Sequence, residues 1–292
     1  MDQAQQLRNV IKKQNQKILQ GPARVITVTS GKGGVGKSNV AVNLAVQFQR
    51  MGKKVIIFDA DFGLANVEVM FGAMPKYNLS DLVYRDKKIQ DILSKGPEGI
   101  EFISAGSGIL SLNNLSRNQI TYIVNAMKQL ESMADVIIID TGAGVSDSVM
   151  EFVLASPEIL LVTTPDPTSL TDSYSLLKAL HNSPEFFKRR TKVNVVANRA
   201  LSVADGDAVF RKLESVVKQF LDGDINYMGM IPQDASLEKA VRQQKPVSMC
   251  YPDAKSAKAF RKLADELMSN GNSDEGEKWT ISKLFQKITS RE

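Results

Sequence analysis

The glycine-rich stretch Gly31–Ser38 constrains the fold of this 292-residue chain more than any other segment. It reads Gly-Lys-Gly-Gly-Val-Gly-Lys-Ser, follows the apolar run 25–29, and leads into residues 39–50, whose apolar side chains have helical spacing. A glycine-rich turn between a strand and a helix is the setting of a phosphate-binding loop, because glycines let consecutive N–H groups converge on phosphate oxygens. The segment therefore predicts a nucleotide-binding protein of the α/β class.

Every residue of this loop is predicted to contact the nucleotide. Lys37 would place its charge at the β- and γ-phosphates, and the Ser38 hydroxyl would be a ligand of Mg²⁺. The helix that follows would add the positive end of its dipole. The predicted loop residues are Gly31, Lys32, Gly33, Gly34, Val35, Gly36, Lys37 and Ser38.

Two later apolar runs end in aspartate. Residues 55–58 lead into Asp59-Ala60-Asp61, and residues 136–139 lead into Asp140. Continuous apolar runs are typical of parallel strands covered on both faces, so we expect a doubly wound, mostly parallel sheet with helices on both sides. Ligands bind at the carboxyl ends of such strands. Asp140 is therefore expected to hold a water bound to Mg²⁺.

Composition favours one α/β domain with appendages in the cytoplasm. The chain is 43% hydrophobic, yet no apolar run approaches the roughly 20 residues of a membrane-spanning helix, and the N-terminus lacks the apolar core of a signal peptide. The single cysteine, Cys250, permits no internal disulfide. A net charge of +5 is a mild excess that by itself identifies no anionic partner.

Residues 1–20 form a separate N-terminal arm. Ala4, Leu7, Ile11 and Ile18 fall on one helical face, and Gly21-Pro22 ends the pattern. A lone helix with so few apolar contacts is marginal in water. It either packs on the domain of residues 21–268 or orders on contact with a partner, and the residues alone leave both possibilities open.

Residues 278–292 form an amphipathic tail after the polar linker 269–277. The apolar stripe is bounded by an aromatic residue suited to a membrane interface, and lysines lie on the opposite face. Burial of four apolar side chains contributes roughly 6 kcal/mol before ordering costs, which predicts weak, reversible binding to an anionic membrane surface. Docking on the domain's own surface is the alternative. The predicted membrane residues are Trp279, Ile281, Leu284, Phe285 and Ile288.

Four motifs carry a resemblance to a known family. The loop has the form K-G-G-x-G-K-S and resembles the deviant phosphate loop of the MinD/ParA ATPases; residues 59–66 fit D-x-D-x-G-L-x-N, and residues 140–144 read D-T-G-A-G. Residues 2–8 match D-Q-A-x-x-L-R, the arm signature of the flagellar branch called FlhG, YlxH or FleN. The chain is thus identified as similar to the flagellar MinD-like ATPases.

That resemblance implies roles for individual residues. Lys32 would reach across a homodimer to the partner's nucleotide, Asp61 would position the attacking water, and Asp59 would help order the metal site. The catalytic residues that the resemblance implies are therefore Lys32, Lys37, Asp61 and Asp140. Four further residues would contact ATP or ADP, the first at the adenine edge and the last two, in an I-P-x-D segment, against the base: Asn198, Arg199, Pro232 and Asp234.

The resemblance also implies partners for the arm. It would contact flagellar basal-body and C-ring proteins and stimulate the SRP-type GTPase FlhF, with Gln3 aimed at that enzyme's site. A glutamine amide can orient a water without titrating. The predicted arm contacts are Asp2, Gln3, Leu7 and Arg8.

Together these features predict an ATP-dependent, Mg²⁺-dependent dimerising switch. It would turn over slowly, associate reversibly with the inner face of the cell membrane at flagellar sites, and regulate flagellar number and placement. Rival interpretations are a ParA-type DNA-partitioning ATPase, which needs a basic patch on the dimer, and MinD acting in division-site selection. No nucleic-acid partner is expected. A metal-cluster scaffold ATPase of the Mrp type needs a Cys-x-x-Cys pair, which this chain lacks.

Overall fold

The computed structural model describes residues 23–62, 64, 66–106, 122, 123, 126, 129–184, 186 and 191–270. The N-terminal arm, most of the linker and the amphipathic tail lie outside the described residues. Residues 116–131, in which Ile120, Ile123, Met127 and Leu130 are spaced as on one helical face, are predicted to form a helix that lies only partly within the described residues.

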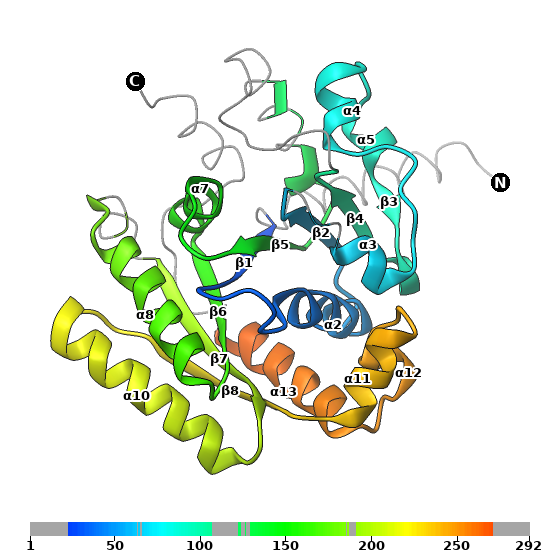
Figure 1. Ribbon diagram of the computed structural model, residues 1–292. Coiled ribbons are helices and arrows are strands. Elements are labelled where there is room, and N and C mark those ends of the chain that lie inside the picture. Colours follow the sequence, from blue (N-terminus) through cyan, green and yellow to red (C-terminus); the bar gives the residue numbers. More distant parts are fainter. Residues whose placement is uncertain are drawn as a thin grey trace, which may run out of the picture.

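Eight strands form one sheet in the order β3-β4-β2-β5-β1-β6-β7-β8 (Figure 1). All neighbours pair in parallel except the short strand β3, which is antiparallel to β4. The strands are β1 (Arg24–Ser30), β2 (Val55–Ala60), β3 (Ser94–Lys95), β4 (Glu101–Ser104), β5 (Val136–Ala143), β6 (Glu158–Thr163), β7 (Lys192–Ala200) and β8 (Asn226–Pro232).

Helices connect the parallel strands, as they must when a crossover separates each pair. Those in the described residues are α2 (Lys37–Arg50), α3 (Asn66–Phe71), α4 (Leu79–Tyr84), α5 (Ile89–Ile92), the 3₁₀ turn η1 (Pro97–Gly99), α7 (Asp147–Ala155), α8 (Pro167–His181), α10 (Val203–Leu221), α11 (Ala235–Arg242), α12 (Val247–Cys250) and α13 (Lys255–Asn270).

Both faces of the sheet are covered, which explains the continuous apolar runs. Successive strand residues alternate between cores: Ile57 packs in the cluster that holds α2 and α13, whereas Ile56 packs with α4, α5 and α7. A third cluster joins β6 and β7 to α8 and α10. Figure 1 shows α8 and α10 on one side of these strands and α13 on the other. The predicted doubly wound sheet is confirmed.

Element boundaries differ from the sequence prediction in a few places. Helix α2 begins at Lys37, two residues before the expected start, and β5 continues three residues beyond Asp140. The short helix α12 was not anticipated, and α13 extends to Asn270, two residues into the expected linker. Residues 72–99 are polar and rich in turn-forming residues, a pattern that predicts short helical pieces, and these are present as α4 and α5.

Among the described residues, no helix combines the length and the apolar character needed to cross a membrane.

Candidate functional site

The phosphate-binding loop joins the central strand β1 to α2. Gly34 and Gly36 have φ values of 77° and 98°, a left-handed conformation that glycine adopts without strain. Gly36 occupies the N-cap position of α2, and no described side chain caps this helix end. The first-turn N–H groups of α2 therefore face the loop, which is the arrangement that binds anions.

Helix α2 holds the loop in place through its buried face. Val40, Leu44 and Phe48 have no exposed surface. Burial of each such side chain contributes about 1.5–3 kcal/mol, so the helix start is a rigid platform. The chain just before the loop is also held, because the N–H of Gly144, directly after β5, donates to the carbonyl of Ser30, the last residue of β1, at 2.9 Å.

The sheet register places two predicted aspartates next to each other beside this loop. Strands β1 and β2 both pair with β5, and Asp140 lies opposite Val28 on one side and opposite Asp59 on the other. The carboxylates thus come from neighbouring strands at one edge of the sheet, where open α/β folds bind their ligands.

Asp140 is the most strongly perturbed group of the site. It is fully buried, and neither carboxylate oxygen accepts a hydrogen bond of normal geometry from any of the described residues. Burial raises the pKa of Asp140 to about 7, although the nearby Ser38 hydroxyl and Lys37 ammonium favour its charged form. A buried carboxylate without a strong partner is costly, so this residue is arranged for something other than stability.

Lys37 is buried with only 8% of its surface exposed. Burial lowers the pKa of this ammonium, and the carboxylates of Asp140 and Asp61 oppose that effect. The predicted phosphate-binding lysine and the two predicted catalytic aspartates therefore share one electrostatic environment.

Asp59 and Asp61 differ in their surroundings. Asp59 is 1% exposed, and its two carboxylate oxygens accept from the backbone N–H groups of Asp61 at 3.2 Å and Val67 at 3.1 Å. Asp61 is half-buried, accepts from the Asn66 amide at 3.1 Å, and is near the backbone of Gly142. Burial raises the pKa of both carboxyls. Asp59 thus shapes the turn that aims Asp61.

The residues present fit a Mg²⁺ ion that is held largely by phosphate oxygens and water. No group of three or more His, Cys, Asp or Glu side chains in the described part of the chain could hold a metal ion unaided. Asp140 offers two buried, unsatisfied oxygens beside Ser38. Mg²⁺ in nucleotide sites commonly uses one or two protein oxygens with substrate phosphates, which matches this donor set.

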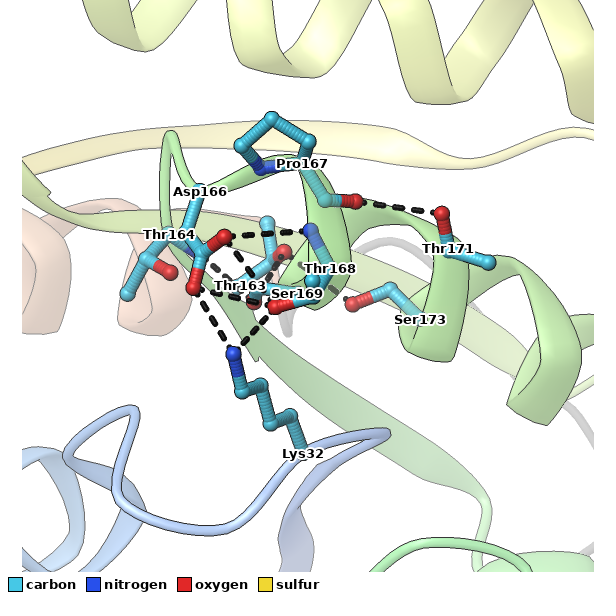
Figure 2. A network of polar contacts seen from close by, with 9 residues as sticks. All are labelled: Lys32, Thr163, Thr164, Asp166, Pro167, Thr168, Ser169, Thr171 and Ser173. Atoms are coloured by element: carbon cyan, nitrogen blue, oxygen red, sulfur yellow. Dashed lines mark hydrogen bonds and ion pairs between the residues drawn. The ribbon is translucent and has the colours of Figure 1, made fainter.

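The side chain of Lys32, a loop residue, reaches the start of helix α8 in the same protomer (Figure 2). Its ammonium forms an ion pair with the Asp166 carboxylate at 2.8 Å and a hydrogen bond with the Thr168 hydroxyl. The sequence predicted a lysine that reaches across a dimer. In this single chain its side chain is instead bound in cis, by residues the sequence prediction did not select.

Asn198 contacts the loop backbone. Its amide nitrogen donates to the Val35 carbonyl at 2.7 Å, and its amide oxygen accepts from the Arg199 N–H at 3.0 Å. A Cβ on Gly36 would overlap this amide, so the glycine is required here for space as well as for φ. The predicted adenine contact remains a prediction, and the structure adds a loop-supporting role. Arg199 is exposed and has a φ of 57°.

Pro232 is the last residue of the edge strand β8, and Asp234 follows two residues later. The Asp234 carboxylate accepts from the N–H groups of Ser236 at 2.8 Å and Ser256 at 2.9 Å, and from the Ser256 hydroxyl at 2.8 Å. This side chain therefore caps α11 and connects it to the start of α13. Its predicted position against the base remains a prediction, beside this structural role.

Three residues of the site were not among the predicted site residues. Asn66 holds Asp61, and Asp166 and Thr168 hold Lys32. The sequence could have indicated Asp166 as the start of a helix, because an aspartate followed by proline at the end of a strand is typical of that position. Asp166 also stands at the carboxyl edge beside β1, since β6 pairs with β1.

Comparison with known proteins agrees with this geometry. The family described as "ParA: NUBPL iron-transfer P-loop NTPase" matches residues 22–268. The antiactivator FleN of Pseudomonas aeruginosa is 42% identical over 248 residues, covering 85% of this chain and 87% of FleN. The flagellum site-determining protein YlxH of Helicobacter pylori is 33% identical over 273 residues, covering 92% and 90% of the two chains.

Solved structures share the fold. The cell division ATPase MinD of Pyrococcus furiosus has a TM-score of 0.68 and 25% identity, covering 85% of this chain and 99% of its own. The septum site-determining protein MinD of Pyrococcus horikoshii, solved with Mg-ADP, also has a TM-score of 0.68 and 25% identity, covering 86% and 98%.

Proposed function

The chain belongs to the ParA/MinD family of P-loop NTPases, in the flagellar branch with FleN and YlxH, and from this premise we propose that it is an ATP-hydrolysing dimeric switch that regulates flagellar number and placement. The observation that carries the proposal is the buried Asp140 carboxylate, unsatisfied and adjacent to Lys37 and Ser38. Such a cluster is unfavourable unless a ligand completes it.

ATP binding uses the loop and the first turn of α2. The left-handed glycines orient backbone N–H groups toward the phosphates, and Lys37 adds a charge at the β- and γ-phosphates. Ser38 and Asp140 would hold Mg²⁺, which when bound neutralises charge on the phosphate oxygens. Asn198 supports the loop from behind through Val35.

Hydrolysis uses Asp61 to orient the attacking water. Asp61 is half-buried, and its position is set by Asn66 and by the turn that Asp59 organises. Burial raises the pKa of Asp61, and the nearby Lys37 ammonium and the Asn66 amide oppose that effect by favouring the ionised carboxylate. Turnover is slow and Mg²⁺-dependent in this proposal, as is typical of a nucleotide-dependent switch and not of a metabolic enzyme.

ATP also drives dimerisation, in which Lys32 crosses to the nucleotide of the second protomer. The dimer presents two copies of the tail 278–292, and two weak anchors joined in one particle bind a membrane far better than one. The protein is thus cytoplasmic when monomeric and peripheral on the inner face of the cell membrane when dimeric.

The names of the relatives support the biological role. FleN is an antiactivator and YlxH determines flagellum sites. We extend the proposal to the arm: Gln3 and its neighbours stimulate the SRP-type GTPase FlhF, and other surfaces contact basal-body and C-ring proteins. Iron transfer, which the family description mentions, is disfavoured because the chain has one cysteine.

The test combines light scattering with liposome binding. The full-length protein should be monomeric with ADP and dimeric with Mg²⁺ and a non-hydrolysable ATP analogue, and only the dimer should bind anionic liposomes strongly. Removal of residues 278–292 should eliminate liposome binding and leave basal ATPase activity intact, whereas Lys37→Ala should lose nucleotide and dimer. A wild-type protein that stays monomeric with ATP would overturn the switch.

Two rivals give different results in the same assays. A DNA-partitioning ATPase would bind DNA in an ATP-dependent, salt-dependent manner and ignore liposomes. A division-site MinD would not need residues 1–20. Deletion of that arm should abolish stimulation of the partner GTPase, and intact stimulation would refute the arm's assignment.

A further inference from the structure

The Lys32 ammonium contacts two side chains of the same protomer (Figure 2). Asp166 Oδ2 accepts from Lys32 Nζ at 2.8 Å, and the Thr168 hydroxyl lies against the same nitrogen. That hydroxyl also donates to Asp166 Oδ1 at 3.0 Å, so the three polar groups form one closed cluster. We refer to Lys32, Asp166 and Thr168 as the cis clamp.

The acidic side of the cis clamp is fixed in position. Asp166 is the N-cap of α8 and accepts from the Thr168 N–H at 3.1 Å. One turn further, the hydroxyls of Ser169 and Ser173 bond to Thr163 at the end of β6, at 3.1 and 3.0 Å (Figure 2). Because α8 is attached to the sheet in this way, the Asp166 carboxylate cannot follow Lys32 if the lysine moves away.

The lysine side of the cis clamp is held on the same helix through the backbone. A Cβ on Gly31 would overlap the backbone of Asp172 and Ser173, so the loop packs directly on α8 at this point. The Ser30 hydroxyl donates to the Lys32 carbonyl at 2.7 Å. The backbone of residue 32 is therefore pinned next to α8, and only the long side chain is free to choose a partner.

The Asp166 carboxylate is charged at neutral pH. Its hydrogen bond from Lys32 and the Thr168 N–H keep the pKa of this exposed carboxyl below its usual range. The pair is also accessible to water and salt, with 37% of the Lys32 side chain and 47% of the Asp166 side chain exposed. The contact is thus of the kind that can be exchanged for another anion.

We infer that Asp166 is a positioning residue for Lys32, which it holds in cis, so that the lysine must leave the cis clamp before it can reach a nucleotide on the second protomer. This inference rests on the proposed ATP-dependent dimer. It adds a threshold to dimerisation, namely the free-energy cost of breaking the Lys32–Asp166 contact in each protomer. A ligand that offers Lys32 a stronger anion than one carboxylate, such as the polyphosphate of ATP in the facing protomer, would draw the lysine out of the clamp.

The expected size of the threshold follows from the exposure of the pair. Exposed ion pairs change an equilibrium by a factor of about two to five. Two clamps open per dimer, so loss of the clamp should lower the dimer dissociation constant by about four-fold to twenty-five-fold. Because the contact is screened by salt, this effect should shrink at high ionic strength.

Asp166→Asn in the full-length protein is the informative variant. Asparagine keeps an Oδ1 acceptor for the Thr168 N–H, so the α8 cap survives while the charge is removed. Glu214→Gln is the matched control, because it removes the acidic half of another exposed lysine pair, with Lys218 at 2.7 Å on α10. Sedimentation with Mg²⁺ and a non-hydrolysable ATP analogue should find a tighter Asp166→Asn dimer in low salt and convergence with wild type in high salt.

Either of two outcomes in that experiment overturns the inference. An unchanged dissociation constant means that the clamp does not oppose dimerisation. A weaker Asp166→Asn dimer means that Asp166 serves the assembled dimer instead. If the dissociation constants of Asp166→Asn and wild type become equal at high salt, the difference at low salt comes from the removed charge. General damage to α8 would persist at high salt.

A second measurement tests the clamp without dimerisation. Acylation of lysine amines in nucleotide-free protein, followed by mass spectrometry, should label Lys32 about two-fold faster or more in Asp166→Asn than in wild type, with Lys218 unaffected. Glu214→Gln should give the reverse pattern. Equal Lys32 labelling in all three proteins refutes the clamp even if the dimer forms. Faster Lys32 labelling in a protein that never dimerises would refute the proposed switch and leave the cis contact established.

Discussion

Asp59 and Asp140 occupy directly opposed positions on the neighbouring strands β2 and β5, and both are almost wholly buried. Their environments nevertheless differ. Asp59 receives two backbone hydrogen bonds, whereas neither Asp140 oxygen has a described donor in hydrogen-bond geometry. Asp59 is therefore already committed to the protein's own backbone, and Asp140 is the carboxylate left for a ligand.

The buried Asp140 carboxyl should make the stability of the nucleotide-free protein depend on pH. Its pKa is raised from 3.8 to about 7, mainly by burial. Between these values the folded chain keeps a proton that the unfolded chain has released. The free energy of unfolding should therefore fall as pH rises from about 4 to 7, then level off. Asp59 and Asp61 have raised pKa values too and would contribute in the same direction.

Asp140→Asn tests this contribution, because an amide does not ionise. Relative to wild type, the variant should gain stability as pH rises from about 5 to 8, on the order of 1–3 kcal/mol. Urea unfolding at both pH values measures the change, and Glu214→Gln serves as the charge control. A constant difference between variant and wild type at both pH values would contradict the raised pKa. ATP hydrolysis should be lost in Asp140→Asn.

Asp61→Ala should separate binding from chemistry. Removal of the carboxylate that orients the water should lower turnover by about 10²–10⁴-fold and leave ATP binding and the dimer in place. Phosphate release and sedimentation measure the two effects. Glu68→Gln on α3 removes a nearby charge and should have no effect. Asn66→Ala, which frees Asp61 from its amide partner, should cause a smaller loss. A normal rate in Asp61→Ala would refute the water-positioning role.

Local patterns in the sequence were sufficient for much of the fold and part of the site. The strand-loop-helix pattern around Lys37 and the two apolar runs ending at Asp59–Asp61 and Asp140 are short-range signals, and each element lies where it was expected. Because both faces of these strands are buried, the runs indicated helices on both sides.

Such local patterns could not predict contacts between residues that lie far apart in the sequence. The register that sets Asp59 opposite Asp140 joins residues 81 apart, and the Lys32–Asp166 ion pair joins residues 134 apart. Neither depends on a local rule; each results from strand order and from packing of Gly31 on α8. The short helix α12 was missed because it has four residues and lacks a periodic pattern.

Asn198→Asp should distinguish support of the loop from recognition of the base. An aspartate still accepts from the Arg199 N–H but cannot donate to the Val35 carbonyl, and its charge would face that oxygen. If loop support dominates, affinity for ATP and GTP should fall together, by about ten-fold. Nucleotide titration with both triphosphates measures this. A changed preference between ATP and GTP, with total affinity preserved, would instead favour the predicted adenine contact. Asn226→Asp on β8, away from the loop, is the matched control.

Asp234→Asn should affect stability rather than nucleotide binding. Burial alone would raise the pKa of Asp234, but hydrogen bonds from Ser256 and Ser236 lower it overall. A depressed pKa contributes stability above the unfolded value of about 4, and that stability is lost as pH falls through the folded value. The variant retains one cap acceptor, so we expect it to lose about 0.5–2 kcal/mol at pH 7 and a smaller amount at pH 3.

Unfolding curves at the two pH values, with ATP titration at pH 7, test this role of Asp234. Its three hydrogen bonds connect α11 to α13, and α13 packs on the phosphate-loop helix α2. Loosening of this connection should lower the melting temperature without moving Lys37 or Asp140, because α2 is anchored independently by its own buried face. A large loss of ATP affinity with unchanged stability would place Asp234 at the base, as its sequence motif predicted.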